Sequence, residues 1–293
     1  MTDPLLSPFR VTGVYFLKYT RDYVTDDEVK ERYYFTPTLV TGLGIPTPNV
    51  RSSGAYRMHG QFFVGLNIPN RTVVITIPVT GDIQEKSAEI YEWFSQDPST
   101  ISRSSFDMYL ELNTGKRVMS KRVVLTTITE TLHEPLAQFL NITFFCPDPM
   151  WYDAELMSVD AAFYYTGPPD TAINQSIRLP VIGTGTVYPT ITVTGATYLL
   201  NFENVETGQV FGPLYYESSP GETFILNTDP ASPVHGVYSD TALPDNLLTK
   251  AGTPNLELYL DPGFGDNHLL VTGYVTEGTA TITVEWHNAY IGV

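Results

Sequence analysis

The chain has 293 residues, enough for two hydrophobic cores, because a single core rarely grows beyond about 250–300 residues. Its hydrophobic content of 42% and aromatic content of 13% exclude disorder over most of its length. Charged residues make up only 16%, while Gly and Pro each number 22, a balance that favours a mainly β protein over a helical one.

The charge is distributed unevenly along the chain. Residues 1–150 carry 14 Lys and Arg against 16 Asp and Glu, whereas residues 151–293 carry 2 against 16. This asymmetry predicts two domains with different surroundings. It also argues against specific nucleic-acid binding by the second half, since such binding depends mainly on cationic contacts to phosphates.

Cys146 is the single cysteine, so no intrachain disulfide is possible, and we expect a small buried residue there. No N-terminal stretch joins a basic start to a long apolar run, as a cleaved secretory signal would. The longest apolar runs are shorter than the roughly 20 residues of a membrane span. These features predict a soluble protein made in a cytoplasm, without a membrane span.

The first sixty residues give weak signals. Residues 32–50, RYYFTPTLVTGLGIPTPNV, combine a short aromatic strand with a loop rich in Gly and Pro. Residues 71–79, RTVVITIPV, form a β-branched run that is typical of a strand.

One amphipathic helix is predicted within residues 81–98, GDIQEKSAEIYEWFSQDP. Asp82 can cap it, with Glu85 three residues later closing a capping box, and Asp97-Pro98 ends it. Its predicted inner face holds Ile83, Ser87, Ile90, Tyr91 and Phe94. Its outer face holds Glu85, Lys86, Glu89 and Glu92, so we expect the helix to cover one side of a sheet.

Two further strand segments follow the helix. Residues 106–129 predict a hairpin whose tight turn contains Gly115. Residues 138–146, QFLNITFFC, predict a strand with one fully buried face, formed by Leu140, Ile142, Phe144 and Cys146.

The segment CPDPMWY, residues 146–152, ends this strand. Pro147 and Pro149 cannot donate ladder hydrogen bonds, and they hold the chain extended. We therefore interpret Pro147, Pro149, Trp151 and Tyr152 as an anchor that fixes the direction in which the chain passes between domains. The alternative is an ordinary strand end with a few core aromatics.

The second half consists of short strand signals at close spacing, which predict an antiparallel sandwich. They lie at residues 189–195, 198–211, 222–228, 255–260, 268–273 and 279–293. In the last segment the predicted inner face holds Ala280, Ile282, Val284 and Trp286. The predicted outer face holds Thr279, Thr281, Thr283, Glu285 and His287.

No catalytic constellation exceeds chance. The five histidines, His59, His133, His235, His268 and His287, have no metal or nucleophile motif around them. Asp261 and Asp266 could contact a cation through loop oxygens, or they could belong to a Gly-rich turn. The short motifs GLG (42–44) and GTG (183–185) lack the helix that a phosphate site requires.

The only basic cluster is GKRVMSKR, residues 115–122, which contributes Lys116, Arg117, Lys121 and Arg122. Three interpretations remain open for it. It could be a nucleic-acid patch, although no aromatic residue is interleaved. It could be a solvated hairpin edge whose lysines discourage unwanted strand pairing. It could also form ionic contacts with an acidic neighbour in an assembly.

The order of these segments resembles the distal tail proteins (Dit-like baseplate or tail-tip proteins) of long-tailed bacteriophages of the siphophage type. The first-domain likeness lies in RMHGQFF (57–63), RTVVITIPVTG, the single helix, the Gly-turn hairpin and FFCPDPMWY. The second half is similar to the galectin-like, jelly-roll type sandwich of that family, in YPTITVTG, GQVFGPLYYESSPGETFILNTD, LDPGFGDNHLLVTG and ATITVEWHNAYIGV. The resemblance covers residues 55–293.

The resemblance implies a non-enzymatic virion protein without a cofactor. Residues 1–153 would form a β-sandwich or barrel-like ring domain with one helix, and residues 154–293 the galectin-like sandwich. Such proteins form a ring, commonly a hexamer, at the distal end of the tail. The ring joins the tail tube to the tail hub and to fibres or receptor-binding proteins, leaving a channel for DNA. The protein would assemble in the host cytoplasm and end at the virion tail tip.

Three alternatives belong to other classes. A carbohydrate-binding module used in host adsorption could employ Tyr215, Tyr216, Tyr259 or Trp286, although Trp286 lies on the inward face of its predicted strand. A hydrolase that degrades a cell envelope lacks any recognisable nucleophile, metal set or acid pair. A tail-tube or other baseplate subunit would not need the galectin-like second half.

Overall fold

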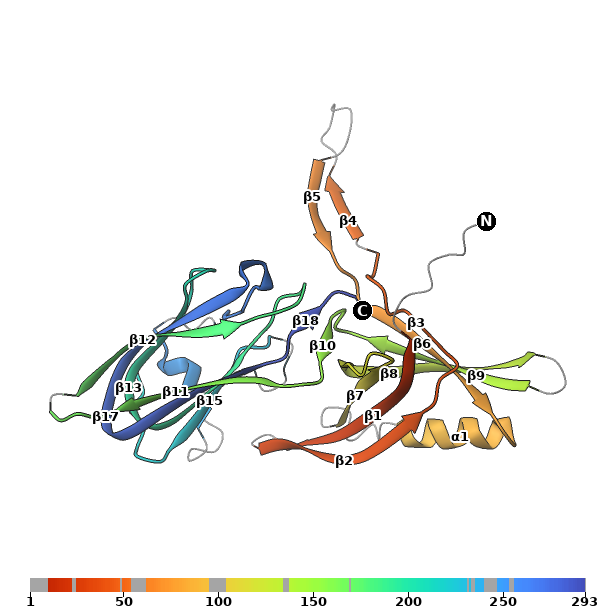
Figure 1. Ribbon diagram of the computed structural model, residues 1–293, viewed down its shortest axis with the longest axis horizontal. Helices are drawn as coiled ribbons and strands as arrows, with labels where there is room; N and C mark the ends of the chain where they lie inside the picture. The colour runs from red at the N-terminus through yellow and green to blue at the C-terminus, as the bar shows by residue number, and fades with distance from the viewer. Residues whose placement is uncertain are drawn as a thin grey trace. The chain divides into compact units, whose positions relative to one another are not determined.

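The computed structural model describes residues 10–22, 25–47, 49–53, 62–94, 104–133, 137–168, 170–230, 232, 235–239, 247–252 and 256–292. The mainly β prediction is confirmed, since strands account for nearly all regular structure (Figure 1). The chain forms two compact units. Unit 1 contains Asp26–Ala154 and resumes at Tyr290, and unit 2 contains Glu155–Ala289.

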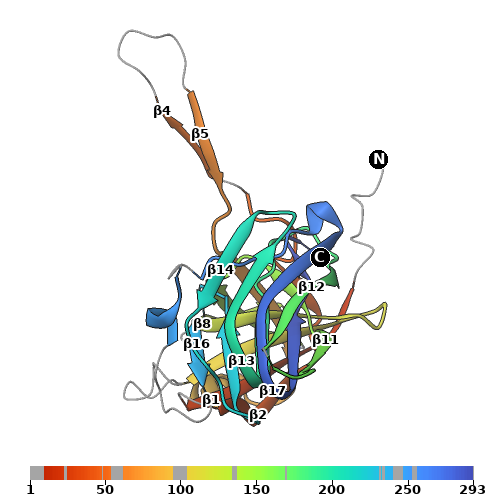
Figure 2. The same cartoon turned by 90° about the vertical axis from the view of Figure 1, so that its left-hand side faces the viewer.

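The main sheet of unit 1 is antiparallel, with the order β2-β1-β7-β8-β9-β6-β3. These strands are β1 (Val11–Asp22), β2 (Thr25–Phe35), β3 (Leu39–Thr41), β6 (Arg71–Val79), β7 (Ser104–Leu112), β8 (Arg117–His133) and β9 (Ala137–Cys146). β10 (Trp151–Asp153) pairs with β8 and with β18 (Ala289–Tyr290). β4 (Asn49–Ser53) and β5 (Phe62–Asn67) form a separate two-stranded sheet (Figures 1 and 2).

Several predicted elements of unit 1 are present. The β7–β8 hairpin turns through Gly115, whose φ of 81° suits glycine, and the Gly115 N–H donates to the Leu112 carbonyl at 2.9 Å. In β9 the predicted inner residues Leu140, Ile142, Phe144 and Cys146 are all fully buried. β9 lies between β6 and β8, so both of its edges are paired.

The predicted helix is α1 (Ile83–Phe94), which lies against β8 and β9. Asp82 caps it, because its Oδ1 accepts from the N–H groups of Gln84 at 2.8 Å and Glu85 at 3.4 Å. Ile83, Ile90 and Phe94 are buried as predicted. Tyr91 is less buried than predicted: its hydroxyl accepts from the Ile128 N–H of β8 at 3.2 Å, but the residue is 47% exposed, and Trp93 packs against the core.

Aromatic rings fill the core beneath the helix. Phe16 of β1 lies with its ring centroid 4.9 Å from that of Phe94 and 4.6 Å from that of Phe144. Phe94 also contacts Phe106, with the centroids 5.3 Å apart. Edge-to-face and offset pairs of this kind add to the burial of large apolar area, so the helix is joined to three strands by one aromatic cluster.

Unit 2 is an antiparallel sandwich built around two long strands, β13 (Thr190–Asn204) and β17 (Asp266–Trp286). One sheet has the order β11-β17-β13-β15-β16, while β12 pairs with β17 and β14 with β13 (Figure 2). The other strands are β11 (Met157–Tyr164), β12 (Thr171–Pro180), β14 (Gln209–Leu214), β15 (Thr223–Asn227) and β16 (Gly236–Ser239). Two short 3₁₀ helices, η1 (Leu247–Lys250) and η2 (Pro262–Phe264), lie in the connections.

Glycines let the long strands bend and serve both sheets. Gly195 in β13 has a φ of 111°, and an added Cβ would press directly on the Thr279 carbonyl oxygen. Gly273 in β17 has a φ of 148°, and its Cβ would lie 2.9 Å from Leu200. Side chains are excluded at these positions both by the backbone angle and by the close neighbouring strand.

The sandwich prediction is confirmed, and its strand list needs correction. The predicted segments 268–273 and 279–286 belong to one strand, β17. The predicted segment 189–195 and the first part of 198–211 likewise belong to one strand, β13. Residues 256–259 are not a strand; only Leu260 makes an isolated bridge, with Val187. The predicted inner residues of the last strand are buried: Ala280, Ile282, Val284 and Trp286.

Some sequence predictions fall outside the described residues: His59, most of RMHGQFF and the helix stop at Asp97-Pro98. Among the described helices, none has the length and apolar character needed to cross a membrane.

Candidate functional site

The most heavily bonded polar side chain of unit 1 is Arg71, the first residue of β6. Its side chain is almost fully buried, with 2% of the residue exposed. Its guanidinium donates to backbone carbonyls from three separate segments. The acceptors are Gly42 O (2.9 Å), Leu43 O (2.9 Å), Gly44 O (2.6 Å), Pro149 O (3.1 and 2.6 Å) and Ile291 O.

Arginine suits this position because its planar fork presents several donors in fixed directions. Burial lowers the pKa of the Arg71 guanidinium to about 10, while Cys146 and Asp148 oppose that shift. The side chain therefore stays charged at neutral pH, and it joins the 42–44 loop, the turn after β9 and the C-terminal segment within unit 1.

Two of the predicted anchor residues belong to this Arg71 centre. Pro149 supplies the carbonyl that accepts twice from Arg71. Trp151 is fully buried, its Nε1–H donates to Leu43 O at 3.2 Å, and the Arg71 guanidinium lies 5.0 Å from its ring centroid. The cation and the indole ring thus attract each other inside the packed core.

The other two anchor residues lie at the edge of the same turn. Pro147 is exposed. Tyr152 is buried, and its hydroxyl donates to Asp148 Oδ2 at 2.6 Å, while the other carboxylate oxygen accepts from the Met150 N–H at 2.9 Å. Asp148 therefore fixes the turn that the two prolines begin.

The predicted basic cluster is dispersed into contacts within unit 1. Lys116 Nζ lies 2.8 Å from Asp153 Oδ1 and 4.0 Å from the Tyr290 ring centroid. Burial opposes the charge of Lys116, but its bonds to Asp153 and Tyr290 outweigh that effect and raise its pKa. Lys121 Nζ lies over the Tyr152 ring, 4.5 Å from its centroid.

The two arginines of the cluster differ in their settings. Arg117 is 59% exposed at its side chain and lies 3.6 Å from Glu111. Arg122 has a φ of 57°, and its backbone N–H donates to Asp107 Oδ1 at 2.8 Å. The sequence neighbours Lys116, Arg117 and Lys121 therefore have different partners within unit 1.

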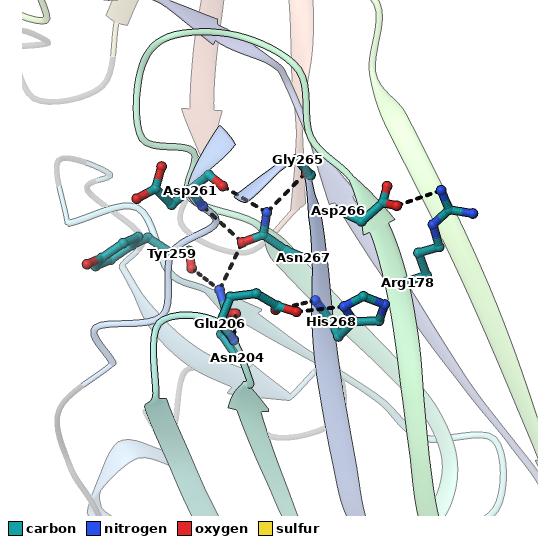
Figure 3. Close-up of polar contacts among 9 residues, drawn as sticks. All are labelled: Arg178, Asn204, Glu206, Tyr259, Asp261, Gly265, Asp266, Asn267 and His268. Carbon is teal, nitrogen blue, oxygen red and sulfur yellow. Dashed lines mark hydrogen bonds and ion pairs between the residues drawn. The ribbon is translucent and has the colours of Figure 1, made fainter. Parts of the chain in front are cut away.

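In unit 2, polar side chains meet where β17 begins (Figure 3). Asn267 is fully buried; its Oδ1 accepts from the Asp261 N–H at 3.0 Å and its Nδ2 donates to Asp261 O at 3.0 Å. Asn204 at the end of β13 donates to Tyr259 O at 2.7 Å and to Asn267 Oδ1 at 3.3 Å. These two amides fix the 259–267 connection against the end of the sheet.

The same corner holds an ion pair and a carboxylate–histidine contact (Figure 3). Asp266 Oδ2 lies 2.6 Å from Arg178 Nη2. Glu206 accepts from the His268 backbone N–H and meets its ring Nδ1, both at 2.6 Å. Burial disfavours the charged form of Glu206, yet the bonds from His268 outweigh it and hold the pKa of the carboxyl below its ordinary value.

The two aspartates considered as cation ligands serve this corner differently. The Asp261 carboxylate caps η2 by accepting from the Gly263 N–H at 2.8 Å, and Asp266 pairs with Arg178. These contacts favour the turn interpretation. Within the described residues, no group of three His, Cys, Asp or Glu side chains could hold a metal ion.

Sequence reasoning missed a buried carboxylate in unit 2. Glu222, 6% exposed, accepts from the Tyr216 hydroxyl, from Ser239 Oγ at 2.6 Å and from the Ser219 N–H at 2.9 Å. Of these residues, the sequence identifies only Tyr216, as a sugar-binding candidate, and its hydroxyl donates to Glu222. Trp286 is 2% exposed, which makes it a core residue rather than a platform.

Taken together, the sheet of unit 1 with its single helix and the sandwich of unit 2 define a fold that is known among phage adsorption proteins. The SPP1 Dit protein, described as a paradigm of the hub adsorption apparatus of phages infecting Gram-positive bacteria, matches with a TM-score of 0.59 at 13% sequence identity. The match covers 92% of this chain and 98% of that one. A chain of the phage P2 baseplate in its activated, calcium-bound conformation gives 0.50 at 10% identity, over 93% and 97% of the two chains.

No protein-family model and no curated protein sequence matches the chain. The structural likeness confirms a Dit-like fold, in agreement with the resemblance carried by the sequence segments. At identities of 10–13% the common feature is the fold, and function is argued separately below.

Proposed function

We propose that this protein is a structural, non-enzymatic component of a bacteriophage tail tip. It forms a ring, a homo-hexamer, at the distal end of the tail and leaves a central channel for DNA. The ring connects the tail tube to the hub and to fibres or receptor-binding proteins. The protein assembles in the host cytoplasm and takes its place in the virion.

The observation that carries this proposal is the likeness to SPP1 Dit over nearly the full length of both chains. A shared single domain would say little, because one fold serves many functions. Here the likeness extends over 92% of this chain and 98% of SPP1 Dit, so it includes both units of this chain. The proposal extends to this protein the hub role for which SPP1 Dit is described.

The charge distribution is compatible with a DNA conduit. A strongly acidic second half cannot neutralise phosphates, so DNA would pass without being retained. The basic cluster supports no competing role as a nucleic-acid patch, since Lys116 and Lys121 already lie against Asp153, Tyr290 and Tyr152.

We assign ring formation to unit 1 and attachment of peripheral proteins to unit 2. A closed ring needs a heterologous interface that repeats around an axis. Arg117 is the most exposed of the described basic residues in the cluster, and we propose that it contributes an ionic contact to that interface. The anchor of Pro147, Pro149, Trp151 and Tyr152 is proposed to fix the direction in which the chain leaves unit 1.

Light scattering combined with negative-stain imaging, across protein concentration and salt, tests the ring directly. We expect particles of about six subunits with a central opening. Arg117→Glu should weaken their assembly, while the control Arg178→Glu, which reverses the charge of a similarly exposed arginine in unit 2, should leave it unchanged. A strict monomer that also fails to join tail-tube and hub proteins would overturn the proposal.

A further inference from the structure

The sandwich of unit 2 has one long edge strand without the protection that sheet edges normally carry. β11 (Met157–Tyr164) pairs with β17, and no other strand within the described residues pairs with it (Figure 2). Its eight residues contain no Pro, Gly, Lys or Arg, and Asp160 is the only charged side chain. Its register with β17 runs without a bulge from Met157 opposite Trp286 to Tyr164 opposite Thr279. Such an edge is a ready template for another strand.

The other edges of the main sheets are protected. β3 and β16 have only three and four residues. β2 carries six charged residues among its eleven, and β14 contains Gly212 and Pro213. β12 breaks its alternation at 174–176, where three successive residues are exposed, and it ends with Arg178 and Pro180. Within the described parts of both sheets, β11 is therefore the edge strand that lacks these protective features.

The backbone direction of β11 follows from one hydrogen bond. The Tyr165 N–H donates to Gly278 O at 2.9 Å, and these residues are opposite each other when the β11–β17 register is continued by one pair. In an antiparallel ladder, hydrogen-bonded residues alternate with residues whose N–H and C=O point the other way. The odd-numbered residues of β11 therefore bond to β17. The backbone groups of Ser158, Asp160, Ala162 and Tyr164 point to the free edge.

The inner face at this edge is incompletely covered. Ala161 and Phe163 are buried, but Met157 and Val159, which share their face, are only partly buried. An added strand with apolar residues at alternate positions would cover them and gain both ladder hydrogen bonds and apolar burial.

We propose that β11 is a docking edge for an extended segment of a different protein, which adds to the sheet as a further strand. A second copy of this chain is disfavoured, because residues 151–293 carry 16 Asp and Glu against 2 Lys and Arg, and two such edges repel. The acidic charge of this half favours a partner segment with basic flanks. Strand addition favours β-branched residues between those flanks. This proposal does not depend on the tail-tip role.

The test uses the full-length protein and a fluorescently labelled peptide, Lys-(Thr-Val)₄-Lys, whose binding is measured by anisotropy. Ala162→Pro removes one N–H from the free edge and leaves the β17 ladder intact, since this N–H points away from β17. Ala162→Val keeps the donor and is the matched control. We expect at least a tenfold loss of affinity for Ala162→Pro and less than a twofold change for Ala162→Val. Hydrogen exchange of the wild-type protein should show new protection in 157–164 when the peptide is bound.

Four results would overturn the proposal. They are no peptide binding by the wild-type protein, equal loss in both variants, protection confined to other strands, and self-association at high salt that Ala162→Pro abolishes. The last result would assign the edge to a second copy. Because ring formation is measured separately, failure here and failure of the tail-tip proposal are distinguishable.

Discussion

Replacing Arg71 by methionine removes the guanidinium that joins three segments of unit 1 and leaves an apolar side chain of similar length. The Gly42 and Gly44 carbonyls lie in exposed loop residues and can bond to water. Leu43 O keeps the Trp151 Nε1–H donor. Pro149 O loses both of the bonds that it accepts from Arg71, and Ile291 O loses the bond that it accepts from Arg71.

A hydrogen bond to a charged group contributes about 1.5–3 kcal/mol, so the bonds lost at these two carbonyls, with the lost packing around Trp151, give an expected destabilisation of unit 1 of about 3–5 kcal/mol. Arg71→Lys keeps the charge without the fork and should lose about half of that amount. Arg178→Met is the control; it breaks one ion pair at a side chain that is 69% exposed and should leave the stability of both units nearly unchanged.

Hydrogen exchange in increasing urea measures this prediction, because it follows the two units separately and a single two-state analysis would not. In Arg71→Met, the free energy of the opening that exposes the amides of β9 and β10 should be lower by about 3–5 kcal/mol, which is the estimated contribution of the lost bonds. Peptides from β13 should not change. A change below about 1 kcal/mol in unit 1 would refute the reasoning that these carbonyls depend on Arg71.

Three further predictions concern single contacts. Asp82→Ala should destabilise unit 1 by about 1 kcal/mol through loss of the α1 cap, as measured by urea unfolding followed by helix circular dichroism. Gly195→Ala should destabilise unit 2 by more than about 1 kcal/mol, because Gly195 has a positive φ and an added Cβ would meet a backbone oxygen. Gly44→Ala, whose added Cβ would have no atom within 4 Å, should be neutral. Thermal unfolding of both variants measures this difference. The lowered pKa of Glu206 means that its bonds to His268 stabilise the protein above the ordinary carboxyl pKa and are lost as the pH falls through the lowered value. Glu206→Gln should therefore lower the melting temperature at pH 6, and the difference should shrink below pH about 4; a constant difference across that range would contradict the assignment.

Local patterns predicted the parts of the fold that depend on near neighbours in sequence. The alternation in β9 and at the end of β17 identified buried residues, and the Asp82 cap and the Gly115 turn are local interactions. The burial of Tyr91 was predicted less well for a physical reason. Helical periodicity places Tyr91 near the inner face, but Trp93 occupies the space beside Phe94 and Phe106.

Long-range features escaped sequence reasoning. The predicted strand segments end at Gly195 and Gly273, yet β13 and β17 continue through these glycines, because the pairing between the two strands resumes beyond each of them. The Arg71 centre joins residues as far apart as Gly42 and Ile291, and no spacing rule brings these together. The contacts of the basic cluster within unit 1 were also beyond the sequence, since Asp153 and Tyr290, which meet Lys116, lie far from it along the chain.

The most direct test of the account is the position of this protein on phage particles. Gold-labelled antibody against unit 2 should decorate virions that carry the protein at the tail end distant from the head, and nowhere else. Labelling of the capsid, labelling along the whole tail tube, or absence of the protein from purified particles would contradict the proposed role at the tail tip.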